Sequence, residues 1–512
     1  MRSVVVDVGP VSPTDLVAVA RDGAAVELSA AARAAIVKGR ETVDTLAAAA
    51  EPAYGVSTGF GALATRHVPL RDRARLQRSL VRSHAAGSGP EVEREVVRAL
   101  MLLRLSTLAT GHTGVRPETA ELLAALLSHG ISPVVHEHGS LGCSGDLAPL
   151  AHCALALIGE GPVRDAAGAL RPAAEVLAEA GLRPVTLGPK EGLALINGTD
   201  GMLGMLVLAL ADLRRLLRSA DVAAAMSVEG LLGTDRVFAE ELQALRPHPG
   251  VGASAANLRV LLAGSGVVAS HRGRDCTRVQ DAYSLRCAPQ VHGAARDTVE
   301  HAAQVAEREL AAAIDNPVVV GDRVESNGSF HGAPLGHVLD FLAIAAADVA
   351  SMSERRTDRF LDVARSRGLP AFLAADPGVD SGHMIAQYTQ AAIVSELKRL
   401  AVPASVDSIP SSAMQEDHVS MGWSAARKLR RSIDGLTRVV GIEVLTAARA
   451  LDLRAPLEPA PGTGAVVALL RGAGVEGPGP DRFLAPEIEV AVELVRSGAV
   501  LRAAEEQVGA LR

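Results

Sequence analysis

The chain has 512 residues, 48% of them hydrophobic and 21% charged, so it is long enough to bury a large core. Its 51 basic and 58 acidic side chains give a formal net charge of −7 and are interspersed, which excludes the basic surface of a nucleic-acid-binding protein. None of the four cysteines forms a Cys-x-x-Cys pair, so neither a disulfide framework nor a zinc knuckle is indicated, and we expect no metal.

The N-terminal segment has an acidic residue within its short apolar stretch and then two prolines. It therefore lacks the uninterrupted apolar core of a signal peptide. The most apolar internal run, residues 202–211, is shorter than the ~20 residues that a membrane span needs. These observations predict a cytoplasmic protein that does not contact a membrane.

Helical patterns dominate the chain. Aromatic residues make up only 2%, and the abundant alanine, leucine, arginine and glutamate favour helices. Apolar positions three to four residues apart predict long helices over residues 91–108, 201–232, 296–313, 337–353, 385–400 and 424–451. The second of these is apolar on nearly every side, which indicates a place at the centre of a helix bundle.

Strand-like segments are few and short. We expect them over residues 3–8, 25–28, 318–320 and 323–325, and Gly321-Asp322 between the last two predicts a small hairpin. Loops rich in glycine, serine and asparagine separate the helices, at residues 87–90, 136–145, 327–334 and 376–383. The Pro- and Gly-rich stretch 456–480 predicts a linker from the last long helix to a C-terminal pair of helices.

The most informative stretch is residues 139–152, which read GSLGCSGDLAPLAH. Taken alone, its Ser-Gly-Asp is most simply a turn before a helix that begins near Asp146. The whole stretch closely resembles the signature of the aromatic amino acid ammonia-lyase family. In that family an X-Ser-Gly tripeptide cyclises on itself to form methylidene-imidazolone (MIO), and the tripeptide here is Cys143-Ser144-Gly145.

The chemistry of this cyclisation explains the residue types. The amide nitrogen of Gly145 must attack the carbonyl carbon of Cys143, and a residue without Cβ lets the backbone fold this tightly. Ser144 then loses its hydroxyl group as water and becomes the exocyclic methylidene. Because the Cys143 side chain stays outside the ring, cysteine should be tolerated where many relatives have alanine. A Gly-x-Ser-x-Gly hydrolase elbow does not fit, since Asp146 occupies the second glycine position.

Two loops before this signature also resemble the family. Residues 54–64 read YGVSTGFGALA, and the resemblance implies that Tyr54 is the base that removes the substrate β-proton. Electropositive neighbours can lower the pKa of a tyrosine enough for this task. Residues 80–87 read LVRSHAAG, and the resemblance places Ser83-His84 in the pocket for the substrate side chain. This pair is similar to that of histidine-specific members, because His84 can hydrogen-bond an imidazole.

Two further blocks resemble parts of the family's site. In EGLALINGT, residues 191–199, Asn197 matches the asparagine that contacts the MIO carbonyl and the substrate, and Asp200 follows where some relatives have Gln. In NGSFHGAP, residues 327–334, the resemblance implies that Phe330 flanks the electrophile. Alone, either block would be a helix start or a glycine-rich turn.

The block at residues 279–293 reads VQDAYSLRCAPQVHG. The resemblance implies that Tyr283 is a second catalytic tyrosine and that Arg286 holds the substrate carboxylate. A planar guanidinium fits a carboxylate with two parallel hydrogen bonds. Gln280 is expected to support this binding.

The last block, residues 411–422, reads SSAMQEDHVSMG. Gln415 and Glu416 match the family's substrate-facing pair, and Gln-Glu is similar to the histidine-specific members. The resemblance implies that Glu416 binds the amine or imidazole of the substrate and shuttles a proton, so the choice of β-proton base between Tyr54 and Glu416 stays open.

The resemblance covers about residues 54–431 and implies a mainly α fold of the fumarase/aspartase-like type. We expect an N-terminal region at 1–200 with the MIO and Tyr54 loops and a few short strands. A central bundle of long helices at 201–455 and a C-terminal helical tail at 456–512 complete the prediction. The resemblance further implies a homotetramer whose active sites are shared between three chains, and a self-made MIO with no diffusible cofactor.

The expected reaction is the non-oxidative deamination of L-histidine to trans-urocanate and ammonia, the first step of histidine degradation. The nearest alternative is a tyrosine or phenylalanine ammonia-lyase or aminomutase that uses the same electrophile. A non-catalytic scaffold and a thiol hydrolase based on Cys143 are the remaining hypotheses. Substrate tests, the mass of residue 144 and alkylation of Cys143 distinguish them.

Overall fold

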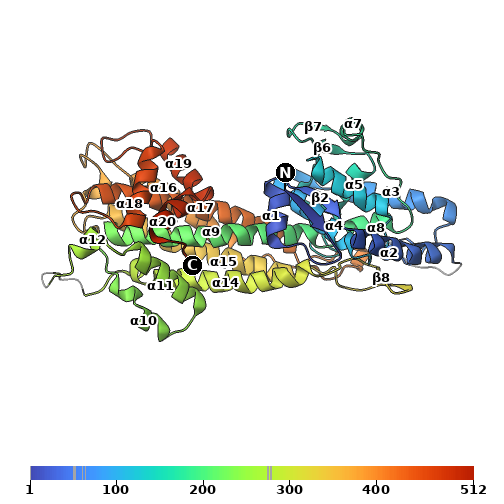
Figure 1. The fold of residues 1–512 in the computed structure, drawn as a ribbon, viewed down its shortest axis with the longest axis horizontal. Coiled ribbons are helices and arrows are strands. Elements are labelled where there is room, and N and C mark those ends of the chain that lie inside the picture. Colours follow the sequence, from blue (N-terminus) through green and yellow to red (C-terminus); the bar gives the residue numbers. More distant parts are fainter. Residues whose placement is uncertain (1, 50–53, 60, 64, 274–275, 277–278) are drawn as a thin grey trace. The chain divides into compact units, whose positions relative to one another are not determined.

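The computed structural model describes residues 2–49, 54–59, 61–63, 65–273, 276 and 279–512. Helices dominate this structure, and its strands are two to four residues long. The expectation of a mainly α-helical protein with a few short strands is confirmed (Figure 1).

Each long helix predicted from apolar periodicity is present, with somewhat different ends. They are α4 (Arg94–Ala109), α9 (Asp200–Gly230), α14 (Ala288–Leu310), α15 (Ala333–Leu361), α16 (Met384–Leu400) and α17 (Gly422–Asp452). The shorter helices are α1 (Pro13–Arg21), α2 (Ala30–Ala48), α3 (Arg73–His84), α5 (Pro117–Ser128), α6 (Leu147–Leu157), α7 (Ala173–Glu179), α8 (Glu191–Ile196), α10 (Glu240–Ala244), α11 (Pro249–Leu261), α12 (Gly266–Ala269), α13 (Tyr283–Arg286), α18 (Pro461–Gly472), α19 (Ala485–Arg496) and α20 (Ala499–Val508).

Two apolar segments, Glu191–Gly230 and Ala333–Leu361, are long and apolar enough to cross a membrane by length and composition. They exceed the ten or so residues of the 202–211 run on which the sequence prediction relied. The apolar window of the first is 100% buried inside the protein and that of the second 61%. The first segment is therefore a core helix region, whereas the second buries one face and exposes apolar side chains on the other.

The strands form small, separate sheets. β1 (Ser3–Val6) pairs in parallel with β2 (Ala25–Leu28), and β8 (Val318–Val320) pairs antiparallel with β9 (Arg323–Glu325), so the predicted hairpin is confirmed. Strands that the sequence did not predict are β3 (Ser88–Glu91), β4 (Ser132–Pro133), β5 (His136–His138), β6 (Pro162–Arg164) and β7 (Leu170–Pro172). β3 and β5 lie in segments predicted to be loops, and they pair with each other across a register shift.

The stretch 456–480 is not wholly a linker, because it contains α18. Pro461 occupies the first turn of this helix, where the missing N–H costs no hydrogen bond. The sequence prediction gave too much weight to proline and glycine content and too little to where the proline falls. The C-terminal helical pair, α19 and α20, is present as expected.

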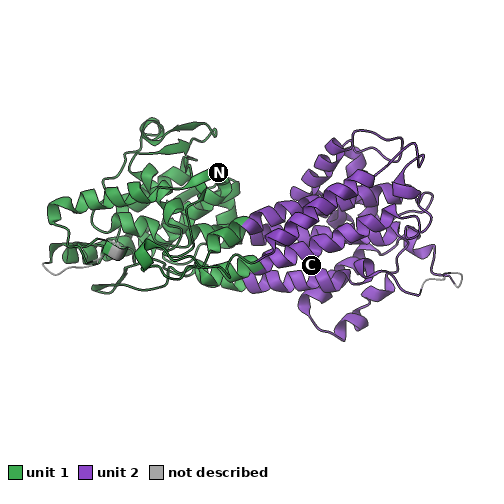
Figure 2. Cartoon of the chain, turned by 180° about the vertical axis from the view of Figure 1, so that it is seen from behind, with its two compact units in different colours: residues 1–208, 303–340, 403–427 green, residues 209–302, 341–402, 428–512 purple. Residues whose placement is uncertain are grey.

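The chain divides into two compact units, coloured separately in Figure 2. Unit 1 comprises residues 1–208, 303–340 and 403–427, and unit 2 comprises residues 209–302, 341–402 and 428–512. Within unit 1, α3, α6 and α8 pack against one another. α9 approaches α4 closely where Gly204 faces Ala99, since a Cβ on Gly204 would lie 3.0 Å from the Ala99 Cβ. The two units are defined by contacts between residues in space, and each combines segments that are distant in the sequence. The division into three consecutive regions expected from the sequence stays a prediction.

Candidate active site

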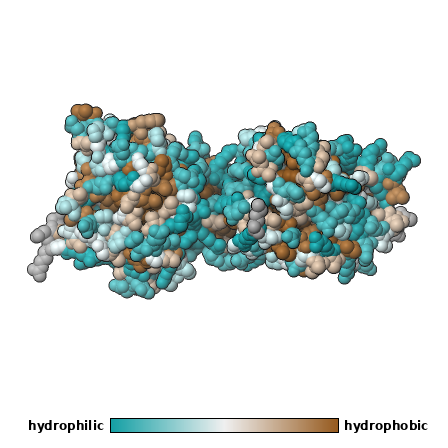
Figure 3. Space-filling model, turned by 45° about the horizontal axis from the view of Figure 1, so that its top comes forward, coloured by the Kyte–Doolittle hydropathy of each residue, from teal (hydrophilic) through white to brown (hydrophobic). Residues whose placement is uncertain are grey.

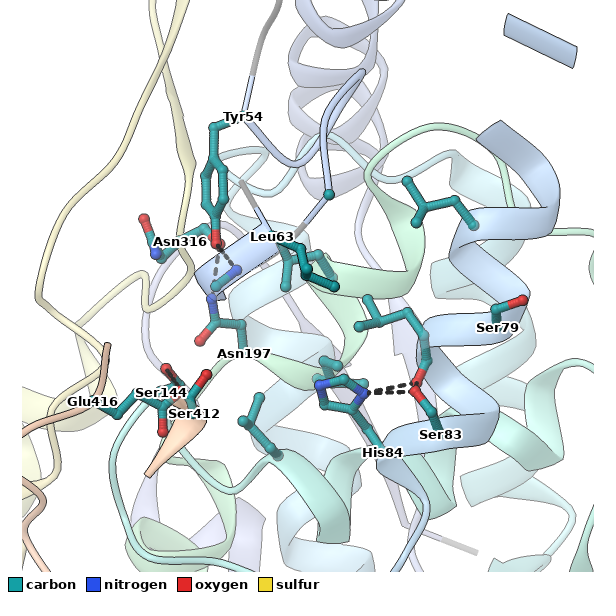
Figure 4. Close-up of a pocket in the computed structure, with 17 residues that line it drawn as sticks. Tyr54, Leu63, Ser79, Ser83, His84, Ser144, Asn197, Asn316, Ser412 and Glu416 are labelled. Carbon is teal, nitrogen blue, oxygen red and sulfur yellow. Dashed lines mark hydrogen bonds between the residues drawn. The ribbon is translucent and has the colours of Figure 1, made fainter. Parts of the chain in front are cut away.

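A cavity of about 470 Å³ opens in unit 1 (Figure 4). Five residues singled out in the sequence line it: Tyr54, His84, Ser144, Asn197 and Glu416. They come from segments far apart in the chain, and the cavity is completed by apolar side chains of α3, α6 and α8. Those side chains are Leu76, Leu80, Leu147, Leu193 and Ile196.

The backbone of the Cys143-Ser144-Gly145 segment is strained in the manner that a tight turn requires. Ser144 has φ 49° and Gly145 has φ 75°, both in the left-handed region. A Cβ on Gly145 would clash with the carbonyl oxygen and backbone of Gly198. Only glycine fits at position 145, because the chain passes directly against a neighbouring backbone there.

Asp146 anchors one side of this loop. Its Oδ1 accepts from Ser140 Oγ at 2.8 Å, and its Oδ2 accepts from the N–H groups of Gly201 at 2.9 Å and Met202 at 3.0 Å. Burial raises the pKa of Asp146 to about 7, although these hydrogen bonds favour the ionised form. Its own N–H donates to Gly198 O at 2.7 Å, so the loop is tied to the start of α9.

The other side of the loop is held by two distant segments. Gly142 O accepts from Ser420 Oγ at 2.6 Å and from Gly332 N at 2.9 Å. Leu141 O accepts from Met421 N at 2.8 Å. The loop is therefore fixed between the starts of α9, α15 and α17 before any chemistry occurs.

The carboxylate of Glu416 faces this loop. Ser144 Oγ donates to Glu416 Oε1 and Cys143 Sγ to Glu416 Oε2, both at 3.3 Å, and Ser411 Oγ donates to Oε2 at 3.0 Å. Burial, together with the charge of Glu416, raises the pKa of the Cys143 thiol to about 12. A thiol that stays protonated is a poor nucleophile, which argues against a hydrolase based on Cys143.

Tyr54 and Asn197 lie on the same side of the cavity as Asn316 (Figure 4). Gly61 N donates to the Tyr54 hydroxyl at 3.3 Å, and Asn197 Nδ2 donates to Asn316 O at 2.7 Å. Asn197 Oδ1 is buried and has no hydrogen-bond partner among the described residues. An unpaired buried acceptor is costly, so this oxygen is available for a donor that the chain itself does not supply.

His84, at the end of α3, presents an acceptor to the cavity. Its Nδ1 lies 2.9 Å from Leu80 O, and because a carbonyl oxygen only accepts, Nδ1 carries the proton. Burial lowers the pKa of His84, so the ring is neutral near pH 7 and Nε2 is an acceptor. Nε2 points away from Ser83, toward the interior of the cavity (Figure 4).

Three members of the predicted site, Gln280, Tyr283 and Arg286, lie in unit 2. Gln280 and Arg286 line a second cavity, of about 440 Å³, together with Arg236, His271 and Arg272. Tyr283 is exposed, and the Arg286 guanidinium carbon stacks 4.6 Å above the centre of its ring. Seven of the predicted residues therefore line one or the other of two cavities, five in unit 1 and two in unit 2.

Phe330 is half-buried and Gln415 is exposed, and neither lines the cavity of unit 1. Two residues near this cavity were not predicted from the sequence. Asn316 lines it and accepts from Asn197, and the buried Arg104 contacts the backbone of Asn197 from α4. The polar Asp-Asn-Pro run around Asn316 was a usable signal, whereas nothing in the sequence around Arg104 distinguishes it from other helix arginines.

The residues present fit the prosthetic group that the sequence motif implies. The glycine-only position at 145 and the left-handed turn at Ser144 are each what a tripeptide folded tightly enough to cyclise requires. The rigid anchoring of Asp146 also keeps the tripeptide folded on itself.

Comparisons with known proteins agree with this geometry. Residues 11–472 match the aromatic amino acid lyase family. The histidine ammonia-lyase of Streptomyces avermitilis is 66% identical over 512 residues, which cover 100% of both chains. The solved histidine ammonia-lyase from Trypanosoma cruzi is 38% identical, with a TM-score of 0.90 over 99% of this chain and 96% of that one. The tyrosine aminomutase from Streptomyces globisporus is also 38% identical, with a TM-score of 0.92 over 100% of both chains.

The chain belongs to the aromatic amino acid lyase family. The family resemblance inferred from the sequence motifs is thereby confirmed, and so is the fold class that it implied.

Proposed function

We propose that the chain catalyses the non-oxidative deamination of L-histidine to trans-urocanate and ammonia. The observation that carries this proposal is the neutral His84, whose Nε2 is a free acceptor site in a cavity that also contains Ser144 and Glu416. An imidazole N–H can donate to this nitrogen, whereas a phenyl ring has no donor. The 66% identity to a histidine ammonia-lyase over the full chain supports the same substrate.

The proposed electrophile is MIO, formed by cyclisation of Cys143-Ser144-Gly145 with loss of two water molecules. The amide nitrogen of Gly145 bonds to the carbonyl carbon of Cys143, whose oxygen leaves as the first water. Ser144 loses a Cα proton and its hydroxyl group as the second. Once formed, MIO supplies an electrophilic carbon that makes the α-amino group a better leaving group. No metal and no diffusible cofactor enter this proposal.

The other residues bind the substrate and move its protons. Arg286 would bind the carboxylate, with Gln280 beside it, and His84 and Glu416 would hold the imidazole ring. Tyr54 would remove the β-proton, and Tyr283 would serve as the second catalytic tyrosine. The unpaired Asn197 Oδ1 would accept from the substrate amine. Phe330 and Gln415 would complete the walls around the electrophile and the substrate.

The alternative substrate is tyrosine, with the same electrophile. It is favoured by the likeness to a tyrosine aminomutase over the full chain, and a phenol O–H can also donate to His84 Nε2. Histidine remains the better proposal, because the relatives with higher identity are histidine ammonia-lyases. A comparison of kcat/KM for L-histidine, L-tyrosine and L-phenylalanine separates the two.

We further propose a homotetramer with active sites shared between chains. α15 exposes Phe341 and Ile344, and α16 exposes Ile385 and Tyr388, which are costly to leave in water. Hydrophobic patches interrupt the hydrophilic surface in Figure 3. We also propose a cytoplasmic location. The proposed regions are an N-terminal region at 1–200 with the MIO and Tyr54 loops, a central bundle of long helices at 201–455 and a C-terminal helical tail at 456–512.

Mixing an inactive variant with a weakly binding one, assayed at low L-histidine, tests the shared site. Ser144→Ala removes the electrophile, and Arg286→Gln removes the carboxylate anchor. If different chains supply these residues, co-expression of the two variants restores part of the activity, because some sites then contain both native residues. Mixtures that show no more activity at low L-histidine than Arg286→Gln alone argue that each chain builds its own site.

The proposed function is tested by intact mass together with ultraviolet detection of conjugated product, for the wild type and Ser144→Ala. The expected wild-type mass is lower than the sequence mass by two waters, and urocanate forms from L-histidine. Ser144→Ala should retain its full mass and make no urocanate. A wild-type mass without loss of water, and no conjugated product from any of the three amino acids, would overturn the proposal in favour of a non-catalytic role.

A further inference from the structure

Arg104 lies on α4 with its side chain only 2% exposed, directly beneath the cavity of unit 1. Its Nη1 donates to Ala194 O and to Asn197 O, each at 3.1 Å, and its Nη2 donates to Ile314 O at 2.9 Å. One guanidinium thus joins the end of α8 to the segment that leads into Asn316.

These carbonyl groups flank the polar wall of the cavity. Asn197 and Asn316 are connected by their own hydrogen bond, from Asn197 Nδ2 to Asn316 O at 2.7 Å. Arg104 binds the backbone of Asn197 directly and binds Ile314, two residues before Asn316. The position of the unpaired Asn197 Oδ1 therefore depends on the guanidinium below it.

The same arginine also sits under the residue that contacts the Cys143-Ser144-Gly145 loop. A Cβ on Gly198 would clash with Arg104 Nη2 and with Asp200 Oδ2, so Gly198 passes tightly over this pair. On its other side, Gly198 O accepts from Asp146 N at 2.7 Å and leaves no room for a Cβ on Gly145. A continuous set of contacts runs from Arg104 through Gly198 to Gly145 and Asp146.

Neighbouring charges keep Arg104 in place. Asp200 Oδ2 lies 3.2 Å from Arg104 Nη2, and Asp200 is itself buried. A second buried pair, between Lys190 Nζ and Asp315 Oδ2 at 2.5 Å, lies in the same segments. Each of these two buried cations lies beside one carboxyl group, which offsets part of the cost of burying its charge.

We infer that Arg104 is a positioning residue for the proposed reaction. It sets the carbonyl of Gly198 against Gly145 during formation of the electrophile, and it sets Asn197 against the substrate during turnover. This inference rests on the proposed function. It predicts that lysine cannot replace Arg104 without loss of function. The two Nη atoms of the guanidinium bind three carbonyl oxygens in two directions, whereas a lysine has a single nitrogen.

The chain offers a matched control on the same helix. Arg98 is also buried on α4, and it donates to two carbonyl oxygens, of Val19 at 2.8 Å and Leu127 at 3.1 Å. Neither carbonyl belongs to the lining of the cavity. Arg98→Lys therefore reproduces the general cost of altering a buried arginine of α4 without touching the site.

The experiment compares the full-length proteins Arg104→Lys and Arg98→Lys by intact mass, thermal unfolding and steady-state kinetics with L-histidine. For Arg104→Lys we expect a fraction of molecules that retain the two waters, and in the mature fraction a kcat lowered about 100-fold with KM changed less than about 3-fold. Arg98→Lys should mature fully, with both constants within about 3-fold of the wild type.

A fully mature Arg104→Lys whose kinetic constants equal those of Arg98→Lys overturns the inference. If Arg104→Lys does not fold, Asp200→Asn decides, because it removes the carboxylate partner of Arg104 and leaves the arginine in place. A lower kcat or incomplete maturation in Asp200→Asn supports the inference, and wild-type values overturn it. A wild-type protein that neither loses water nor forms urocanate instead defeats the proposed function itself.

Discussion

The two cavities that contain predicted site residues are similar in size and differ in chemistry. That of unit 1, about 470 Å³, has no arginine or lysine among its described lining residues and combines apolar side chains with hydroxyl, amide, imidazole and carboxylate groups. That of unit 2, about 440 Å³, is lined by Arg236, Arg272 and Arg286. Reaction with an amino acid needs both kinds of surface, because the carboxylate needs a cation to bind it and the reacting carbon atoms need groups that move protons.

A buried arginine supports the backbone beside each cavity. Arg104 binds three carbonyl oxygens beneath the first. In unit 2, Arg356 donates to Ser284 O at 3.2 Å, next to Tyr283 in α13, and forms a fully buried pair with Glu443. Both sites therefore depend on rigid support behind the residues that meet the ligand. The difference is that the proposed reactive group of unit 1 must first form by cyclisation, whereas the arginine side chains of unit 2 need no modification to bind a carboxylate.

The largest expected effect follows from this difference. Ser144→Ala removes the hydroxyl group that must leave during maturation, so kcat should fall by at least about 1,000-fold. Intact mass should show no loss of water, while circular dichroism stays that of the wild type. Substantial turnover by this variant would mean that unit 1 does not build the electrophile.

Arg286→Gln tests the basic cavity of unit 2. Loss of a charge-assisted, bidentate carboxylate contact costs about 1.5–3 kcal/mol, so we expect KM for L-histidine to rise roughly 10- to 100-fold. Maturation should remain complete by intact mass, in contrast to Ser144→Ala. An unchanged KM would show that another group binds the carboxylate.

His84→Leu tests the specificity assigned to unit 1. The variant removes the acceptor for the imidazole N–H, which costs about 1–3 kcal/mol, or roughly 5- to 150-fold in kcat/KM for L-histidine. Activity toward L-phenylalanine should fall much less or rise, because leucine adds apolar surface. Competition assays with both substrates measure the ratio, and an unaltered ratio would remove His84 from the specificity pocket.

The smallest effect is expected for Cys143→Ala, which should change kcat/KM less than about 3-fold, since the side chain stays outside the ring.

Alkylation of the cysteines tests the raised pKa of Cys143. Only the thiolate reacts, and a pKa raised to about 12 leaves Cys143 protonated at pH 9, so iodoacetamide should modify the exposed Cys276 and spare Cys143. Peptide mapping measures which cysteine is alkylated. A Cys143→Ala variant without activity would instead support the hypothesis of a thiol hydrolase.

Much of the fold followed from local patterns. Helices such as α9 and α17 have a helical pattern of apolar residues over several turns, and this pattern can be recognised without knowing the tertiary contacts. The strands β3 and β5 escaped prediction because one contains glycine and proline and the other two histidines, and because their pairing joins residues more than forty positions apart. α18 escaped because proline at its first turn was taken for a linker.

By itself, the sequence determined the family and the residue types on which the proposed chemistry relies. Ser144 and Gly145 are needed by the covalent steps of the proposed cyclisation, wherever the loop lies. Only the tertiary structure decided which side chains meet there: the proton position on His84, set by Leu80 O, and the support of Asn197 by Arg104. These depend on contacts between segments that are distant in the chain, and such contacts leave no periodicity or motif to be seen.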